Sequence, residues 1–130
     1  MKLYHFTPEH LLFGIKQEGI CKGKIPVLLG HTTVLGFMNG NWFTANPAWL
    51  QEWCNPEYSS LPYDRSAVRL TLDFPEDFPV IQWEKFAVGK LSTTAKILGE
   101  FADPSNWWIS EDPVPVDFIQ AVDFKPKVVT

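Results

Sequence analysis

Residues Ser66–Asp73 read SAVRLTLD and contain the clearest strand pattern in the chain. Apolar side chains at every second position, from Val68 to Leu72, alternate with polar ones, from Arg69 to Asp73. A side-chain period of two predicts a β-strand with one face in the core and the other toward solvent. The elements on either side of this strand then decide what kind of sheet it joins.

Both helices and further strands are expected around this strand. Short strands are predicted, in chain order, at Lys2–Phe6, Pro26–Leu29, Asn41–Thr44, Val80–Gln82, Trp107–Ser110 and Phe118–Phe124. Helices are predicted at Pro8–Glu18, Ala48–Cys54 and Leu91–Leu98. The glycine-rich segment Ile20–Gly40 is otherwise expected to be a long irregular loop. Because strands and helices do not alternate regularly, the order predicts an α+β fold with a mixed or antiparallel sheet.

Length and composition are those of one domain with an aromatic core. The chain has 130 residues, of which 15% are aromatic, so its core is rich in large side chains. Eleven prolines argue against a helical bundle, because each interior proline costs a helix about 3 kcal/mol. We expect one domain over residues 1–124 and a frayed tail over 125–130.

Charge and cysteine content indicate the kind of partner and the cellular compartment to expect. The net charge is −4, and Lys22 and Lys24 are too isolated to announce a nucleic-acid groove. Cys21 and Cys54 form no metal-like pair and no disulfide framework, which is typical of a reducing compartment. No apolar run is long enough for a signal peptide or a membrane span, so we expect a cytoplasmic protein without a membrane partner.

The stretch Tyr4–Glu9 places a histidine at a strand end, directly before a predicted helix. Thr7 suits the N-cap of that helix, Pro8 its first position and Glu9 its positive end. Free amide groups at a helix N-terminus favour anions. The pattern predicts a pocket for an anion or a ribose at this helix end, with His5 beside it.

Most familiar catalytic patterns are absent from the sequence. It contains no Gly-x-Ser-x-Gly elbow, no P-loop and no dinucleotide-binding glycine motif. His5, His10 and His31 lack the spacing of metal ligands, so no metal site is predicted. What remains is a polar set at predicted strand ends, comprising His5, Thr7, Trp42, Phe43, Thr44, Arg65, Arg69, Ser110 and Glu111.

The order of these motifs resembles that of the ADP-ribosyltransferase-like superfamily. The resemblance rests on Tyr4–Thr7, on a helix ending at Gly19-Ile20, and on Asn41–Thr44 followed by Asn46-Pro47. The end of the chain, Trp107–Glu111 followed by Pro113-Val114-Pro115 and Ile119, is similar to the last strands of small members.

This resemblance implies a protein that uses NAD as a substrate, and a role for each matching residue. His5, with Thr7 near it, would bind the adenosine-side ribose, and Trp42, Phe43 and Thr44 would border the nicotinamide. Glu111 would be the catalytic glutamate, hydrogen-bonded to the nicotinamide ribose, with His5 as its catalytic partner. A carboxylate there would stabilise the oxocarbenium-like state of glycosidic cleavage. The implied activity is transfer of ADP-ribose to an unidentified acceptor, or cleavage of the nicotinamide bond.

Two alternatives remain open from the sequence. RNA 2′-phosphotransferases share the resembled fold and rely on histidine and arginine, so Arg65 or Arg69 would hold a phosphate in that variant. The other alternative is a non-catalytic regulator or inhibitor that docks a protein partner through a tryptophan-rich surface, with Trp49 and Trp53 as candidate contacts.

Overall fold

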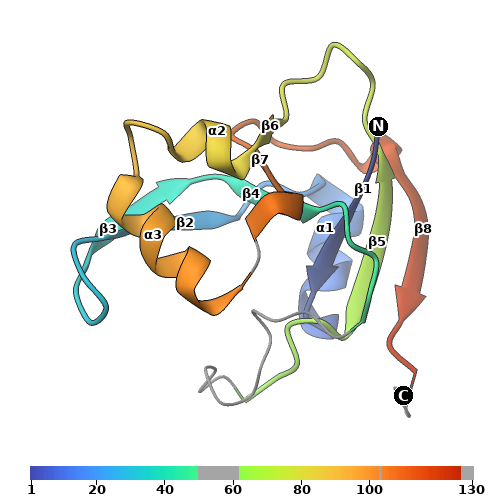
Figure 1. Cartoon of the computed structure of the whole chain (residues 1–130). Helices are drawn as coiled ribbons and strands as arrows, with labels where there is room; N and C mark the ends of the chain where they lie inside the picture. The colour runs from blue at the N-terminus through green and yellow to red at the C-terminus, as the bar shows by residue number, and fades with distance from the viewer. Residues whose placement is uncertain (50–61, 103, 127–130) are drawn as a thin grey trace.

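A six-stranded antiparallel sheet forms the body of the protein (Figure 1). The computed structural model describes residues 1–49, 62–102 and 104–126. The sheet contains β1 (Lys2–Thr7), β4 (Asn41–Thr44), β5 (Val68–Asp73), β6 (Ile81–Gln82), β7 (Trp107–Ser110) and β8 (Ile119–Phe124). They lie in the order β6-β7-β4-β1-β5-β8, and each neighbouring pair is antiparallel. The predicted α+β fold with an antiparallel sheet is confirmed.

The alternation in β5 builds the first of two hydrophobic cores. Val68, Leu70 and Leu72 are completely buried, which confirms the predicted inward face. Helix α1 (Leu12–Glu18) contributes Leu12 to the same cluster. The buried members of this first core are Leu3, Leu12, Ile20, Phe43, Val68, Leu70, Leu72, Phe74 and Val114.

The segment expected to be a long irregular loop folds instead as a β-hairpin. It consists of β2 (Lys24–Leu28) and β3 (Val34–Asn39), which pair with each other as a separate two-stranded sheet. Glycine and proline punctuation conceals the period-two pattern of Ile25 and Val27, and a register shift after Val27 interrupts it. The loop prediction is therefore wrong for most of this segment.

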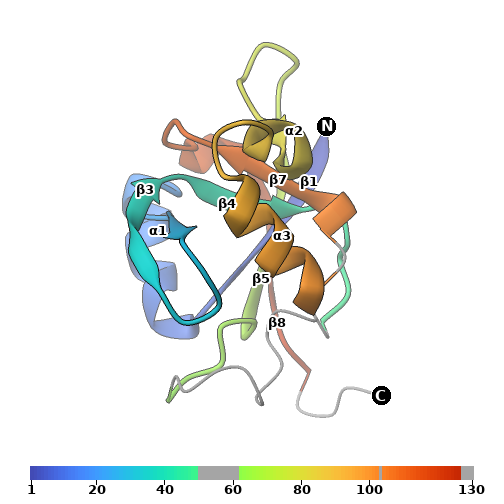
Figure 2. The ribbon, with the colours of Figure 1, turned by 60° about the vertical axis from the view of Figure 1, so that its left-hand side comes forward.

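A second core lies between the hairpin and two helices, α2 (Trp83–Ala87) and α3 (Ser92–Phe101) (Figure 2). Its buried members are Ile25, Trp83, Phe86, Ala87, Leu91 and Ile109. Helix α3 is predicted from the sequence, although it runs further than expected. Helix α2 is not predicted, because five residues are too few to establish a helical period.

The helix expected at Pro8–Glu18 begins differently from the prediction. Residues Glu9–Leu11 form a 3₁₀ turn, and α1 starts only at Leu12. Thr7 does not cap it: its hydroxyl donates a hydrogen bond to the Pro8 carbonyl at 3.4 Å, and no side chain caps the helical segment. The predicted N-cap is therefore wrong.

Two further predictions fall at the edge of the described residues. Ala48 and Trp49 are not helical, and residues 50–54 of the expected helix lie outside the described residues. Lys125, the first residue of the expected tail, is bonded to the domain: its amide donates to the Ala67 carbonyl at 2.8 Å, and its ammonium group donates to the Asp64 carboxylate at 2.8 Å. Residues 127–130 are not described.

Candidate functional site

The sheet opens between its two central strands, β1 and β4. Their register consists of one pair, Tyr4↔Thr44, whereas β1 pairs with β5 along its whole length. Beyond this pair the His5 ring bridges the opening, and its Nδ1 lies 2.7 Å from the Trp42 carbonyl oxygen. A side chain thus takes the place of a backbone ladder at this point.

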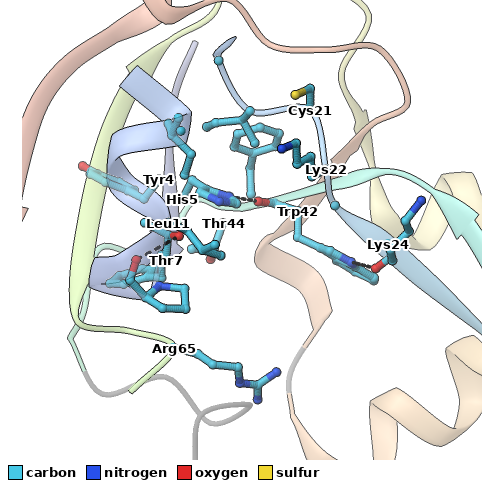
Figure 3. Close-up of a pocket in the computed structure, with 18 of the residues that line it drawn as sticks. Tyr4, His5, Thr7, Leu11, Cys21, Lys22, Lys24, Trp42, Thr44 and Arg65 are labelled. Atoms are coloured by element: carbon cyan, nitrogen blue, oxygen red, sulfur yellow. Dashed lines mark hydrogen bonds between the residues drawn. The ribbon is translucent and has the colours of Figure 1, made fainter. Parts of the chain in front are cut away.

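A cavity of about 520 Å³ occupies this opening (Figure 3). Ligand pockets of proteins commonly measure roughly 300–1,000 Å³. Its walls come from β1, the flank of α1, the connection to β2, and β4, with further side chains from the rest of the chain. They include Tyr4, His5, Phe6, Thr7, Leu11, Gly14, Ile15, Glu18, Cys21, Lys22, Lys24, Pro26, Trp42, Phe43, Thr44, Tyr63, Arg65, Leu98 and Trp107.

Six of the predicted site residues border this one cavity. They are His5, Thr7, Trp42, Phe43, Thr44 and Arg65. Two of them are held by other contacts: Phe43 is buried in the first core, and the Thr44 hydroxyl accepts the Asn46 amide at 3.0 Å. Strand ends that are far apart in sequence therefore meet as expected, although the cavity lies along the flank of α1 rather than before its N-terminus.

His5 is fixed in one tautomer by its backbone partner. A carbonyl oxygen can only accept, so the 2.7 Å contact requires the proton on Nδ1. Burial lowers the pKa of His5, and the hydrogen bond to Trp42 offsets only part of that effect. The ring is neutral at pH 7, and Nε2, which has no protein partner among the described residues, carries a lone pair. It is a hydrogen-bond acceptor for a ligand hydroxyl.

Trp42 forms a rigid wall of the cavity. Its indole Nε1 donates to the Lys24 carbonyl at 2.9 Å, which ties β4 to β2. Its ring also packs against Trp83, with centroids 4.8 Å apart, and edge-on against Trp107 at 5.7 Å. These contacts fix the Trp42 backbone, and with it the carbonyl that orients His5.

The cavity border is positively charged in an acidic protein. Lys22, Lys24 and Arg65 border it, against one carboxylate, Glu18, among the described residues. Glu18 lies 3.4 Å from the Lys22 ammonium group, which neutralises it locally. Figure 3 shows Arg65 approaching from the side opposite Cys21 and Lys22. Cations beside aromatic walls favour an anionic ligand with planar rings.

Lys22 and Lys24 were expected to be isolated surface charges, and their place at the cavity was not predicted. The sequence does contain an indication of this positive region, because the chain has no acidic residue between Glu18 and Glu52. Two lysines in such a stretch are not neutralised by their neighbours in the chain.

Arg69 does not join the cavity. It pairs across the sheet with Phe6, on the face opposite His5, which pairs with Leu70. Its guanidinium donates to the Pro47 carbonyl at 2.7 Å and lies 4.6 Å from the Trp49 ring centroid. Arg69 thus fastens the segment after β4 to the sheet, and the predicted cofactor contact is replaced by this structural one.

Glu111 also lies away from the cavity border. It is exposed in the bend after β7, beyond the pair Asn41↔Ser110. The bend is tied down because the Ser110 hydroxyl donates to the Asp112 carbonyl at 2.7 Å. The structure therefore does not bring the Glu111 carboxylate to His5.

The described tryptophans do not form an exposed surface. Trp83 is fully buried, and Trp42, Trp49, Trp107 and Trp108 are half-buried. Trp53 lies outside the described residues. Exposed apolar side chains gather instead on the hairpin, at Leu29, Val34, Leu35 and Phe37.

The described residues contain neither a membrane-spanning helix nor a cluster of metal-ligating side chains. No helix within residues 1–49, 62–102 and 104–126 is long and apolar enough to cross a membrane. Within the same ranges, no three His, Cys, Asp or Glu side chains gather as a metal site would require.

Comparison of the chain with protein-family models, with curated proteins and with solved structures finds no match.

Proposed function

We propose that the cavity beside His5 binds NAD and that the protein is an ADP-ribosyltransferase-like enzyme. The observation that supports this most is the convergence of His5, Thr7, Trp42, Phe43, Thr44 and Arg65 on one cavity. The neutral His5 offers Nε2 to a ribose hydroxyl, the aromatic walls suit a base or the nicotinamide ring, and the cations suit the pyrophosphate.

The proposed reaction breaks the bond between the anomeric carbon of the nicotinamide ribose and the ring nitrogen. Nicotinamide leaves with the electron pair and becomes neutral. An acceptor oxygen or nitrogen, or water, forms the new bond to the same carbon and releases its proton. In this proposal His5 holds ribose, and Glu111 has no part because it lies away from the cavity.

NAD binding is tested by thermal unfolding with and without the ligand. A ligand at 100 times its dissociation constant adds about 2.7 kcal/mol, or roughly 10 °C for a chain of this size. We expect this upward shift with NAD and with ADP-ribose. It should shrink in His5→Ala, whereas His31→Ala, a matched change at an exposed histidine, should keep it.

Turnover is tested separately by chromatographic detection of released nicotinamide. We expect release by the wild-type protein and unchanged release by Glu111→Gln, because Glu111 lies away from the cavity. Binding without turnover in either protein would reduce the proposal to an NAD-binding protein. Absence of a thermal shift with both ligands would refute the nucleotide pocket.

A further inference from the structure

We propose that the outer edge of β3 is a docking site for an acidic, extended peptide segment, which adds to the hairpin as a third strand. The site consists of the free edge of β3 and the exposed side chains Leu35 and Phe37. Strand addition is a common way of binding peptides, in which backbone hydrogen bonds give affinity and alternate side chains give specificity.

The backbone of β2 shows which groups of β3 face outward. The Lys24 and Pro26 carbonyls bond to Trp42 Nε1 and the Thr94 hydroxyl, on the side of β2 away from β3. In an antiparallel ladder, residues opposite an outward-facing residue also face outward. Asn39 and Phe37 are the partners of Lys24 and Pro26, so their N–H and C=O groups point away from β2.

The edge of β3 lacks the features that usually prevent another strand from pairing with an exposed edge. Among the described residues, no strand pairs with β3 other than β2, and β3 itself (VLGFMN) contains neither a charge nor a proline. Leu35 and Phe37 are each 66% exposed. Phe37 lies on the hairpin face of Lys24 and Pro26, because paired residues share a face, whereas Leu35 lies at the register shift and has no paired residue in β2. Lys24 and Pro26, on that face, also line the cavity.

Charge complementarity makes the partner acidic. The chain between Glu18 and Glu52 has no acidic residue, and Lys24 lies at the base of the hairpin, whereas Lys22 is paired with Glu18. The Lys24 ammonium group contacts the Asn39 side chain, so it stands beside the outward end of β3. A partner strand would therefore place apolar side chains opposite Leu35 and Phe37, and a carboxylate opposite Asn39.

A peptide fits this surface better than a nucleic acid. Single-stranded nucleic acids need several aromatic platforms along a basic groove, whereas Phe37 is the one aromatic side chain of this edge. Two nearby lysines also neutralise too few phosphates for tight binding. Aliphatic Leu35 and an unpaired backbone edge match an extended polypeptide.

The place of the site suggests what the segment does. Because Lys24 and Pro26 of the hairpin face also line the cavity, a bound segment would present one of its side chains to the NAD site as the acceptor. This last step rests on the proposed function, whereas docking at β3 does not.

Panning of phage-displayed random dodecapeptides on the purified full chain tests the proposal. Selected peptides are synthesised with a fluorescent label, and their affinities are measured by fluorescence polarisation. The double variant Leu35→Ser/Phe37→Ser is compared with Val88→Ser, which removes an equally exposed apolar side chain elsewhere. Circular dichroism establishes that both variants are folded.

We expect peptides in which apolar residues alternate and Asp or Glu follows. Their binding should weaken about tenfold or more in the double variant, remain unchanged in Val88→Ser, and disappear when alternate peptide amides are N-methylated. Basic or patternless peptides, or equal binding to both variants, would overturn the proposal.

Two other occupants are also distinguished. Binding of a 20-nucleotide oligo(U) that depends on Phe37 would assign the surface to nucleic acid, and a dimer in light scattering that the double variant abolishes would assign it to a second copy. Either result overturns the peptide proposal. A wild-type protein that binds the peptides but shows no thermal shift with NAD would refute the proposed function alone.

Discussion

Thr94 in α3 is the side chain that we expect to hold the hairpin in place. It is 1% exposed, and its hydroxyl accepts the Leu28 amide at 2.9 Å and donates to the Pro26 carbonyl at 3.1 Å. Thr94→Val keeps the shape of the side chain but removes both hydrogen bonds. Each is worth about 0.5–1.5 kcal/mol, and the two backbone groups left without a partner gain no new one, so the expected loss is about 2 kcal/mol.

Thr93→Val is the matched control, because Thr93 is exposed on the same helix and the substitution is identical. Urea and thermal unfolding of both variants measure the difference, which should be about 2 kcal/mol, or roughly 7 °C in the midpoint. Hydrogen exchange of the Leu28 amide should accelerate in Thr94→Val alone. If the two variants unfold within about 0.5 kcal/mol of each other, the assignment of Thr94 as the anchor of the hairpin is refuted.

Three further predictions concern other parts of the molecule. The folded pKa of His5 lies below the unfolded value of about 6.5, so the unfolded chain takes up the proton first. The free energy of unfolding should therefore fall on acidification from pH 7.5 to 5.5, by at most about 1.4 kcal/mol per pH unit. In His5→Asn the pH dependence of this free energy, measured by urea titration, should be smaller, and an equal dependence would contradict the burial effect. Gly19→Ala should lower the free energy of unfolding by about 2 kcal/mol or more, because φ is 81° and the new Cβ would lie 2.2 Å from a carbonyl oxygen. Gly14→Ala, which has open space in α1, should instead raise it by about 0.5–1 kcal/mol. Similar melting temperatures for the two variants would refute this prediction. Lys125→Met should lower stability by about 1 kcal/mol or less, and high salt should reduce the difference, since its partner Asp64 is partly exposed; a loss that salt does not change would show that the charge is not the cause.

Local alternation explains why the sheet could be predicted. β4 and β7 have the predicted bounds, and β5 has the predicted inward face, because short apolar alternations flanked by turn residues carry their own signal. Strand β3 of the hairpin was missed because Gly36 interrupts its apolar pattern, whereas β2 overlaps the strand predicted at Pro26–Leu29. Pro26 is tolerated there since its nitrogen faces away from β3, a fact about register that no local pattern contains.

The same limit applies to the candidate site. His5 and Thr44 border one cavity because the pair Tyr4↔Thr44 sets the end of β4 beside the middle of β1, a register that the sequence pattern does not contain. Arg69 was wrongly included, since a strand's two faces can be told apart only when its pairing is known, and the pair His5↔Leu70 places Arg69 on the other side. The prediction that Glu111 lies at the site is wrong for a similar reason, because the direction of a bend after a strand is set by tertiary contacts.

The single pair Tyr4↔Thr44 has a consequence for how the protein unfolds. On β4, Phe43 belongs to the first core, while Trp42 packs against the second. On β7, Trp108 packs against the first core and Ile109 belongs to the second, so these two short strands connect the cores. A ligand in the cavity would touch both halves and act as a clamp between them. We therefore expect the free protein to unfold less cooperatively than the ligand-bound one, with the hairpin and its helices melting as a separate unit in the absence of ligand.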